Sequence, residues 1–586
     1  MKINSIKIKN FRNLNDVQIS FHPDTNYIIG ENNIGKSNLL FLMNALFSGK
    51  GFDESDFTNA DNPIEIELSL RLVEEEIGFF KDYFSPEEPC LVNFKIEQRL
   101  EDVYPSMYHV ESGDLLSYKL LKKAHYINYN TNAVPDKSLR FDSPRGLGPL
   151  FKSITSSYIQ TNGDISFLNE EKINELKNFI NEYLKKIHSF NLFSVEASIV
   201  EQPSDILAKL FSLSNGNYNI NETGCGVQFM AMASVNILCQ IMDIYKKKGS
   251  SFLDQLYEVD KEDANGVLQR NKILPLILAI DEPEVHLHPF LQRSLIGYYK
   301  KILNNQDGDF CSLLKMLFGI DGLSGQLLIV THSTDALLDD YRNLIRFYKR
   351  SGLTKVACGI SFHRRDRVEI VEKHLPLHFP EIKEAFYAKS AVLIEGPTEF
   401  GCMRLFADKL GISLDEKSIC VVNAGGEANI RPIQNLLASF GILSVALFDG
   451  DVRDGRGGAN TFFTNELCFE VELVKELYNA GQKDLVKNIA TILDENALSV
   501  RLDHDFGEKW LVKKLKVPNT LTTPKTLNDV DDDDVNEFCN LYSSFFMSKK
   551  GILLGRIVGN LVPKELIPRC YSDVISAAIV RAEQAV

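Results

Sequence analysis

Short apolar runs alternate along the chain with segments whose apolar residues recur at helical spacing. Ile3, Ile6 and Ile8 begin an apolar N-terminal strand, and Tyr27–Ile29 forms a second one. Residues 38–47 carry Leu, Phe and Met at the spacing of one helix face, which predicts a helix soon after the second strand. Alternating strands and helices of this kind indicate an α/β fold.

Four later apolar runs also predict short buried strands, and each ends in polar or charged residues. They are Leu276–Ile280, Leu327–Val330, Ala391–Ile394 and Ser444–Phe448. In open α/β sheets, ligands bind at the carboxyl ends of the strands. We therefore look for chemistry in the residues that directly follow each run.

Residues 30–37, Gly-Glu-Asn-Asn-Ile-Gly-Lys-Ser, fit the phosphate-loop pattern G-x-x-x-x-G-K-[ST]. A loop between a strand and a helix aims backbone N–H groups and the positive helix end at phosphate oxygens. The alternative is a glycine turn that happens to carry Lys-Ser, which the flanking elements disfavour. Lys36 would reach the β- and γ-phosphates of ATP, and Ser37 would hold magnesium. The nucleotide-binding residues predicted in this loop are Gly30, Asn32, Asn33, Gly35, Lys36 and Ser37.

Two later strand ends supply further parts of an ATPase. Asp281 would bind magnesium, mostly through water, and Glu282 would orient or deprotonate the attacking water. His332 follows another apolar run and is suited to sensing the γ-phosphate. Alone, this histidine would more often be a packing residue, but its order after the phosphate loop favours function. Upstream, a glycine-rich helix start is interpreted as contributing to a second nucleotide across a dimer interface, through Gly224, Gly226 and Gln228.

A second set of carboxylates follows the last two apolar runs. Glu395 and Glu399 lie in Glu-Gly-Pro-Thr-Glu, and Asp449 and Asp451 flank a single glycine. Together they supply hard oxygen ligands for Mg²⁺ or Mn²⁺. The alternative is a pair of solvated loops, which is less favoured because clustered like charges are costly without a cation.

Composition agrees with a large cytoplasmic enzyme. The chain has 586 residues, 44% hydrophobic, with ten cysteines and a net charge of −15. No C-x-x-C pair, signal sequence or membrane span is expected. DNA binding would need a local positive surface in so acidic a protein. The candidates are Lys509, Lys513, Lys514, Lys516, Arg453, Arg456, Lys549 and Lys550.

The N-terminal motifs resemble the ABC-type ATPases of the SMC and RecF group. The resemblance is carried by residues 30–37, Asp281-Glu282, residues 284–289 and Thr331-His332-Ser333. It implies two ATP molecules between two heads, with residues 224–228 as the signature from the opposite head. That segment departs from the usual Leu-Ser-Gly-Gly-Gln form. Because a nucleotide site shared by two heads needs at least two chains, we expect a homodimer or a homotetramer built as a dimer of dimers.

The C-terminal carboxylates resemble a Toprim domain, and an ABC-type head followed by Toprim resembles the overcoming-lysogenization-defect (OLD) family of ATPase-nucleases. That family includes Gabija-type and retron-associated anti-phage effectors. The resemblance implies ATP, Mg²⁺ or Mn²⁺, DNA, and a partner such as a helicase or a reverse transcriptase with its DNA–RNA product. It also implies one more acidic residue, Glu470 in preference to Glu472, and a catalytic lysine, Lys550 in preference to Lys549.

These assignments predict two domains and one favoured function. Residues 1–385 would form the ATPase, with a helical insertion at about 150–215 that carries dimer contacts. Residues 386–586 would form a Toprim domain with a helical C-terminal addition. The favoured function is an ATP-regulated, metal-dependent DNA endonuclease of phage defence. The alternative is a RecF-like DNA-binding or repair clamp with a non-catalytic Toprim domain. A topoisomerase is less favoured, because Toprim topoisomerases need a strand-attacking tyrosine in another domain and nothing in this sequence marks one.

The residues assigned by this interpretation fall into two sets. The catalytic set is Glu395, Glu399, Asp449, Asp451, Lys550 and Glu282. The metal-ligand set is Glu395, Glu399, Asp449, Asp451, Glu470, Ser37 and Asp281.

Overall fold

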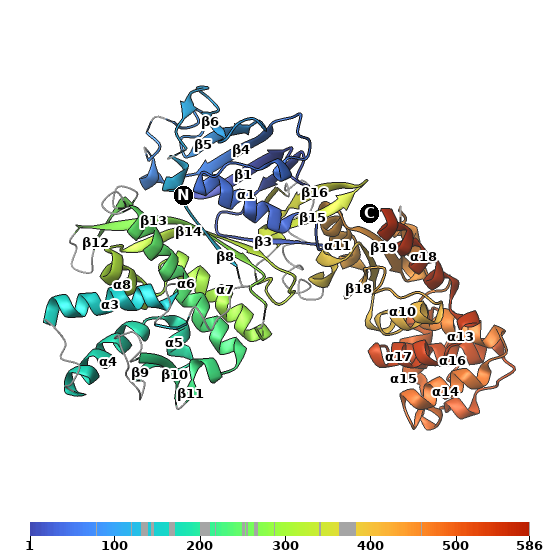
Figure 1. Cartoon of the computed structure of the whole chain (residues 1–586). Coiled ribbons are helices and arrows are strands. Elements are labelled where there is room, and N and C mark those ends of the chain that lie inside the picture. The colour runs from blue at the N-terminus through green and yellow to red at the C-terminus, as the bar shows by residue number, and fades with distance from the viewer. Residues whose placement is uncertain are drawn as a thin grey trace. The chain divides into compact units, whose positions relative to one another are not determined.

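The computed structural model divides the chain into two units (Figure 1). Unit 1 comprises Met1–Phe347 with Cys358–Ser361, and unit 2 comprises Tyr348–Ala357 with Phe362–Val586. The structure describes residues 1–584 except 78, 82, 119, 131–138, 142–145, 163–169, 200–210, 217, 249–251, 253–255, 263–267, 286, 339–340, 362–381 and 459. The domain boundary at 385 stays a prediction.

Unit 1 begins with an antiparallel sheet that the apolar pattern predicted only in its first strand. Its order is β2-β1-β4-β5-β6-β7. In β4, Ile64, Ile66 and Leu68 are buried on one face, and β1 pairs Ile6 with Leu68 across the sheet. The strands are β1 (Lys2–Lys9), β2 (Val17–Ser20), β4 (Ile64–Arg71), β5 (Leu91–Gln98), β6 (Ser106–His109) and β7 (Leu115–Leu116).

A second, mostly parallel sheet forms the centre of unit 1, with the order β12-β13-β14-β3-β15 and β8 paired to β13. Residues 273–280 of β13 are continuously buried, as expected for a parallel strand covered on both faces. In Figure 1, helices α6, α7 and α8 lie along one side of this sheet. The strands are β3 (Thr25–Gly30), β8 (His125–Asn130), β12 (Tyr257–Glu262), β13 (Leu268–Asp281), β14 (Gly322–Val330) and β15 (Leu344–Arg350), followed along the chain by β16 (Leu353–Cys358).

The predicted helical insertion contains helices and also strands. Strand β9 lies against α4, where the Asn181 side chain accepts a hydrogen bond from the Ala197 N–H at 2.7 Å. The strands are β9 (Val195–Ile199), β10 (Phe211–Asn215) and β11 (Tyr218–Asn219). The helices of unit 1 are α1 (Lys36–Ser48), α3 (Leu147–Asn162), α4 (Glu170–Leu184), α5 (His188–Leu192), α6 (Cys225–Lys248), α7 (Pro289–Leu303) and α8 (Gly308–Phe318).

Among the described helices, only α6 is long and apolar enough to cross a membrane by length and composition. Its window Gly226–Lys246 is 62% buried inside the protein. A core helix of a folded domain passes the same length test, and burial of this extent fits such a helix.

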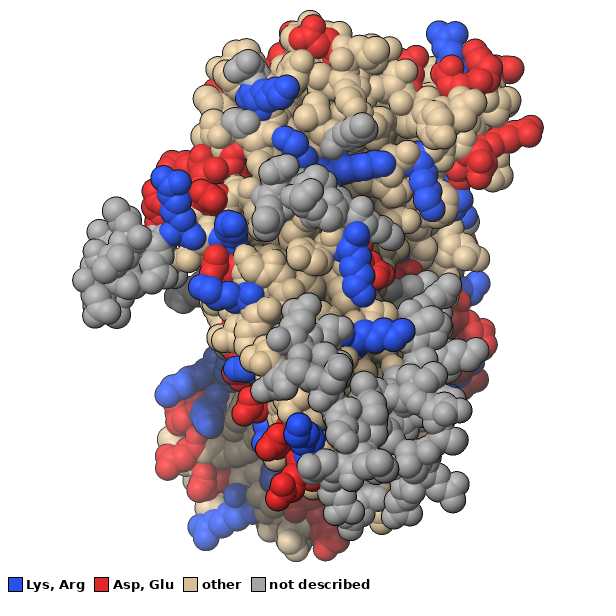
Figure 2. All heavy atoms as spheres, turned by 60° about the vertical axis from the view of Figure 1, so that its left-hand side comes forward, with Lys and Arg blue, Asp and Glu red and all other residues tan. Residues whose placement is uncertain are grey.

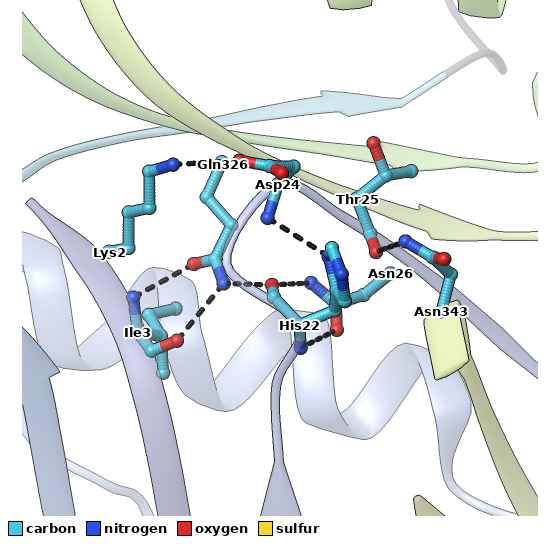
Figure 3. Close-up of polar contacts among 8 residues, drawn as sticks. All are labelled: Lys2, Ile3, His22, Asp24, Thr25, Asn26, Gln326 and Asn343. Carbon is cyan, nitrogen blue, oxygen red and sulfur yellow. Dashed lines mark hydrogen bonds and ion pairs between the residues drawn. The ribbon is translucent and has the colours of Figure 1, made fainter. Parts of the chain in front are cut away.

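A buried glutamine ties β1 to β14 (Figure 3). The Gln326 side chain has no exposed surface, and its Oε1 accepts the Ile3 N–H at 2.8 Å. Its Nε2 donates to the carbonyl oxygens of Ile3 at 3.0 Å and His22 at 2.9 Å. Beside it, Asn343 Nδ2 donates to the Thr25 carbonyl at 2.7 Å. Because these buried polar groups are paired, they hold β1 and the segment before β3 against β14 at little cost.

Unit 2 contains a four-stranded parallel sheet, and two of its strands are the ones predicted at Ala391–Ile394 and Ser444–Phe448. Its order is β18-β17-β19-β20. In the register, Ile394 of β17 pairs with Asn423 and with Leu447, so three strands end at one edge. Glu395 and Asp449 directly follow two of these ends. The strands are β17 (Ser390–Ile394), β18 (Ile419–Asn423), β19 (Leu443–Phe448) and β20 (Thr461–Phe463).

Helices cover this sheet and form the predicted C-terminal addition, and the helices between residues 469 and 561 gather at one end of unit 2 in Figure 1. Helix α16 begins at Val535, because the Asp534 carboxylate accepts hydrogen bonds from the Asn536 and Glu537 N–H groups. The helices are α10 (Pro397–Lys409), α11 (Glu427–Ser439), α12 (Arg453–Arg456), α13 (Phe469–Asn479), α14 (Lys483–Leu493), α15 (His504–Gly507), the π-helix Glu508–Leu515, α16 (Val535–Ser548), α17 (Ile552–Leu561) and α18 (Arg569–Gln584).

Glycines bring α10 and α17 unusually close together. A Cβ added at Gly555 would lie 2.0 Å from the Thr398 carbonyl oxygen and 2.9 Å from the Gly401 Cα. The Gly551 N–H donates to Thr398 Oγ1 at 3.1 Å at the start of the same contact. This close packing holds the segment before α17, which carries Lys550, against the first turn of α10.

Gly555→Ala is expected to destabilise unit 2 by about 2–4 kcal/mol, because the added methyl group overlaps backbone that cannot move away cheaply. Urea unfolding followed by fluorescence of Trp510, the one tryptophan of the chain, measures the effect. Gly457→Ala is the control, since a Cβ at Gly457 meets no atom within 4 Å. Equal stability of the two variants would contradict the proposed role of the α10–α17 packing.

Candidate functional site

The loop between β3 and α1 is held open by glycine. Gly30 has φ +142°, and a Cβ at this position would lie 2.3 Å from the Phe347 carbonyl oxygen. Gly35 has φ +113°, a backbone conformation that residues with a side chain rarely adopt. Lys36 Nζ donates to the carbonyl oxygens of Gly30 at 2.8 Å and Glu31 at 2.6 Å. The loop therefore curls around its own lysine ammonium group.

This loop lines a cavity of about 550 Å³. Asn32, Asn33, Gly35, Lys36 and Ser37 line it together with Glu282 and His332. Most of the residues that the sequence assigned to nucleotide binding therefore share one pocket.

Asp281 lies at the end of β13, next to the phosphate loop. Its Oδ2 lies 3.4 Å from Ser37 Oγ, which donates to it. Burial and the nearby Glu282 raise the pKa of Asp281. Burial also lowers the pKa of Lys36 to about 8, against the opposing effect of Glu282 and Asp281. A serine hydroxyl beside an aspartate offers the oxygen ligands that Mg²⁺ prefers.

Glu282 has an unusual backbone conformation, with φ +51°. A non-glycine residue in this region is strained, and such strain is concentrated at functional sites. His332 Nε2 lies 3.9 Å from Glu282 Oε1. Burial lowers the pKa of His332, and the positive charge of Lys36 lowers it further. Glu284, whose role was not predicted, accepts a hydrogen bond from Thr331 Oγ1 at 2.8 Å and so fixes the strand end that carries His332.

The glycine-rich start of α6 lies elsewhere in unit 1. Gln228 Nε2 donates to the carbonyl oxygens of Asn221 at 3.2 Å and Thr223 at 2.9 Å. Gly224, Gly226 and Gln228 are not among the residues that line the described loop cavity. Their assignment to a nucleotide of a second chain stays a prediction. In a separate predicted motif, residues 284–289, His286 lies outside the described residues.

The second site lies in unit 2, where β17 and β19 end. The Asp449 N–H lies 3.4 Å from Glu395 Oε2, and Asp449 Oδ1 accepts the Phe469 N–H at 3.3 Å. Between the two aspartates, a Cβ at Gly450 would lie 2.1 Å from the Glu466 carbonyl oxygen. The turn therefore requires glycine, and it presents carboxylates on both sides.

Lys550 faces two of the predicted carboxylates. Its Nζ lies 3.0 Å from Glu470 Oε2 and 3.7 Å from Asp449 Oδ2, and the Glu470 side chain is fully buried. Glu472 instead accepts a hydrogen bond from the Asn465 N–H at 2.6 Å. Lys549 forms an ion pair with Asp494 at 2.9 Å. The structure thus places the two preferred residues, rather than their neighbours, in the cluster.

The pKa values show that the predicted carboxylates interact. Burial and the negative charge of Glu470 together raise the pKa of Glu399 to about 7. Burial and the negative charge of Glu399 together raise the pKa of Asp449 to about 8. Burial also raises the pKa of Glu395, and Asp451 adds to that effect. Burial is the largest single influence on Lys550 and opposes its charged form, but Glu470, Asp449 and the other nearby acidic groups together outweigh it, so the pKa of Lys550 lies above its usual value.

Sequence reasoning missed one further carboxylate, Glu427 at the start of α11. Its charge contributes to the raised pKa of Glu395. The signal was Gly425-Gly426-Glu427 soon after β18, the third strand to end at this edge. Among the described residues, no three His, Cys, Asp or Glu side chains converge closely enough to hold one ion in this conformation. The donor set itself, in which Glu399, Asp449 and Glu470 are buried and repel one another while Asp451 is exposed, fits Mg²⁺ or Mn²⁺.

Glu399→Gln is expected to stabilise the protein above neutral pH. The folded-state pKa of about 7 exceeds the ordinary value of 4.5, so the folded parent loses stability as pH rises through this window. The variant lacks that penalty and should exceed the parent by on the order of 2 kcal/mol at pH 8, with no such gain at pH 4. Urea unfolding at both pH values tests this, and an equal difference at both would exclude the buried charge as the cause.

Comparisons with known proteins agree with both sites. The AAA ATPase domain family matches residues 1–191 and 147–336, more than half of the chain. The Toprim domain of overcoming lysogenization defect protein-like proteins matches residues 386–451. The second match contains Glu395, Glu399, Asp449 and Asp451.

Two curated relatives extend over most of the chain. The Old nuclease of Escherichia phage P2 is 21% identical over 92% of this chain and 87% of its own length. Endonuclease GajA of Bacillus cereus (strain VD045) is 23% identical over 78% of this chain and 76% of its own length. The DNA replication and repair protein RecF of Chlamydia caviae is 47% identical, but over 14% of this chain and 22% of its own length.

The family matches follow the order of the two sites along the chain. The predicted fold class, an α/β ATPase head followed by an α/β Toprim domain with a helical C-terminal addition, is confirmed. This chain therefore belongs to the AAA ATPase domain family, and its OLD-type Toprim match, together with relatives that span both sites, supports an ATPase-nuclease of the overcoming-lysogenization-defect type.

Proposed function

We propose that this chain is an ATP-regulated, divalent-metal-dependent DNA endonuclease that acts in defence against phage. The observation that carries the proposal is Lys550, held between Asp449 and the fully buried Glu470 at the end of a parallel sheet. A buried cluster of this kind is costly to fold, which argues for a chemical role. The Old nuclease and endonuclease GajA, named above, support the same reaction class.

In this proposal, Glu395, Glu399, Asp449, Asp451 and Glu470 hold one or two Mg²⁺ or Mn²⁺ ions. Such ions supply charge neutralisation and an activated water for phosphodiester hydrolysis. The Lys550 ammonium group donates a hydrogen bond to the phosphate oxygen on which charge develops. Phe469, whose N–H donates to Asp449, and Thr398, which accepts from Gly551, position the carboxylate and the lysine segment.

The same proposal assigns ATP regulation to unit 1. Lys36 and Ser37 bind the phosphates and magnesium together with Asp281, and Glu282 orients the attacking water. We further propose that Gly224, Gly226 and Gln228 complete the nucleotide site of a second copy, so the active form is a homodimer or homotetramer. Light scattering with ATP should give a multiple of 66.2 kDa, and a 66.2 kDa species alone, with and without ATP, would contradict this assembly.

The chemical proposal is tested with purified protein and supercoiled plasmid DNA. Nicked or linear product should form with Mg²⁺ or Mn²⁺ and disappear with EDTA. If the chain alone is inactive, the assay is repeated with an added partner, which is either a helicase or a reverse transcriptase with its DNA–RNA product. ATP-dependent DNA binding without cutting under all these conditions would favour the RecF-like clamp, which the short RecF match supports.

A further inference from the structure

Four lysines in unit 2 differ from their neighbours in having no carboxylate partner. Lys509, Lys513, Lys514 and Lys516 are exposed, and none forms an ion pair within the part of the chain that the structure describes. Other lysines of unit 2 do form such pairs. Besides Lys550 they include Lys475, Lys483, Lys487, Lys525 and Lys549.

The acidic run before α16 does not neutralise these four lysines. Asp533 pairs with Lys483 at 3.2 Å, and Asp532 pairs with Lys487. On the face drawn in Figure 2, Lys and Arg side chains lie among acidic and neutral ones. Four unpaired lysines within eight residues are therefore a local excess of positive charge in a chain of net charge −15.

The π-helix Glu508–Leu515, which carries three of these lysines, is anchored beside the carboxylate cluster. Trp510 is partly buried and packs against Cys468, Val471 and Met547. Cys468 and Val471 flank Glu470 along the chain, and Met547 lies three residues before Lys550. Lys509 Nζ lies 5.0 Å from the centre of the Trp510 ring, which restrains this lysine. The packing therefore fixes exposed lysines next to the elements that carry Glu470 and Lys550.

We infer that the surface formed by Lys509, Lys513, Lys514 and Lys516, here called the π-helix surface, binds the phosphate backbone of duplex DNA next to the carboxylate cluster. Exposed ammonium groups replace the counterions of DNA phosphates without reading the base sequence. Binding here would hold the strand near the carboxylates despite the negative charge of the protein. This inference rests on the proposed nuclease function for its purpose, but DNA binding can be measured separately.

The test compares two quadruple variants with the same change in net charge, both made with Asp449→Asn to prevent cutting. The first replaces the four lysines of the π-helix surface with Gln. The control replaces the paired lysines Lys475, Lys483, Lys487 and Lys525 with Gln. Fluorescence anisotropy of a labelled 30-base-pair duplex over a range of salt concentrations gives the affinity and its salt dependence.

The π-helix variant should bind at least about tenfold more weakly than the Asp449→Asn protein. The slope of log affinity against log salt should fall by about 0.9 for each DNA phosphate that the variant no longer neutralises. The control should keep both quantities, and Trp510 fluorescence should show that both variants are folded. If the π-helix variant keeps the affinity and the salt slope of the Asp449→Asn protein, the inference is overturned. Equal losses of affinity in the π-helix variant and the control would also overturn it, because they would report net charge alone.

The same substitutions, made without Asp449→Asn, separate this inference from the proposed function. If the parent cuts plasmid and the π-helix variant cuts at low salt with a raised KM, both proposals are supported. If no protein cuts but the π-helix variant alone loses duplex binding, the surface stands and the nuclease proposal fails. If the parent cuts and the π-helix variant binds and cuts like the control, the nuclease proposal stands and the inference fails.

Discussion

Asp449→Asn is expected to lower the rate of plasmid nicking by about 10³-fold or more, to the level of a reaction without metal. Asp449 contributes a buried carboxylate between Glu395 and Lys550, and an amide in its place supplies a weaker, neutral ligand. Glu395→Gln should act in the same direction. The initial rate of nicking of supercoiled plasmid in Mg²⁺ and in Mn²⁺ measures both effects.

Asp454→Asn is the matched control, because Asp454 is exposed on α12, five residues beyond Asp449. It should cut at the parental rate. ATP hydrolysis by all three variants should stay within about twofold of the parent, since the loop cavity belongs to unit 1. Undiminished nicking by both Asp449→Asn and Glu395→Gln would show that another site or a contaminant cuts the DNA.

Two substitutions in the loop cavity should separate nucleotide binding from hydrolysis. Lys36→Ala should weaken ATP binding by about 10- to 100-fold, because the variant lacks the ammonium group that donates a charge-assisted hydrogen bond to phosphate. Glu282→Gln should bind ATP with parental affinity and hydrolyse it about 100-fold more slowly, because the water is no longer oriented or deprotonated. Equilibrium binding of a fluorescent ATP analogue and phosphate release measure the two effects.

Lys50→Ala provides the control for this pair, since Lys50 is exposed just beyond α1 and should leave both quantities unchanged. The Glu282→Gln protein also holds ATP long enough to show whether bound nucleotide activates or restrains DNA cutting. Parental affinity in Lys36→Ala, together with parental turnover in Glu282→Gln, would exclude the assigned ATPase chemistry.

Local patterns were sufficient to predict the placement of the main functional groups. The phosphate loop, Asp281 and His332 each follow a short apolar run, and parallel pairing brings such ends to one edge. The same reasoning placed Glu395 beside Asp449. The choice of Glu470 over Glu472 came from family resemblance, and the structure adds a reason, because Glu472 is engaged by Asn465.

Other features depend on pairing between distant segments and were missed. Glu427 reaches the site only because β18 pairs with β17, and Glu284 has a partner only because β14 lies beside β13. The six-stranded antiparallel sheet and the strands β9 and β10 also arise from such pairing. Residues 224–228 were assigned to the nucleotide site of a second chain, and this assignment stays a prediction.

Two adjacent lysines offer the most direct test of the central claim, that the carboxylate cluster of unit 2 cuts DNA with help from Lys550. Lys549 pairs with Asp494, whereas Lys550 faces Asp449 and Glu470. The measurement is single-turnover nicking of supercoiled plasmid at saturating metal by Lys549→Met and Lys550→Met. We predict parental cutting by Lys549→Met and about 100-fold slower cutting by Lys550→Met. Equal rates for the two variants, or the reverse order, would contradict it.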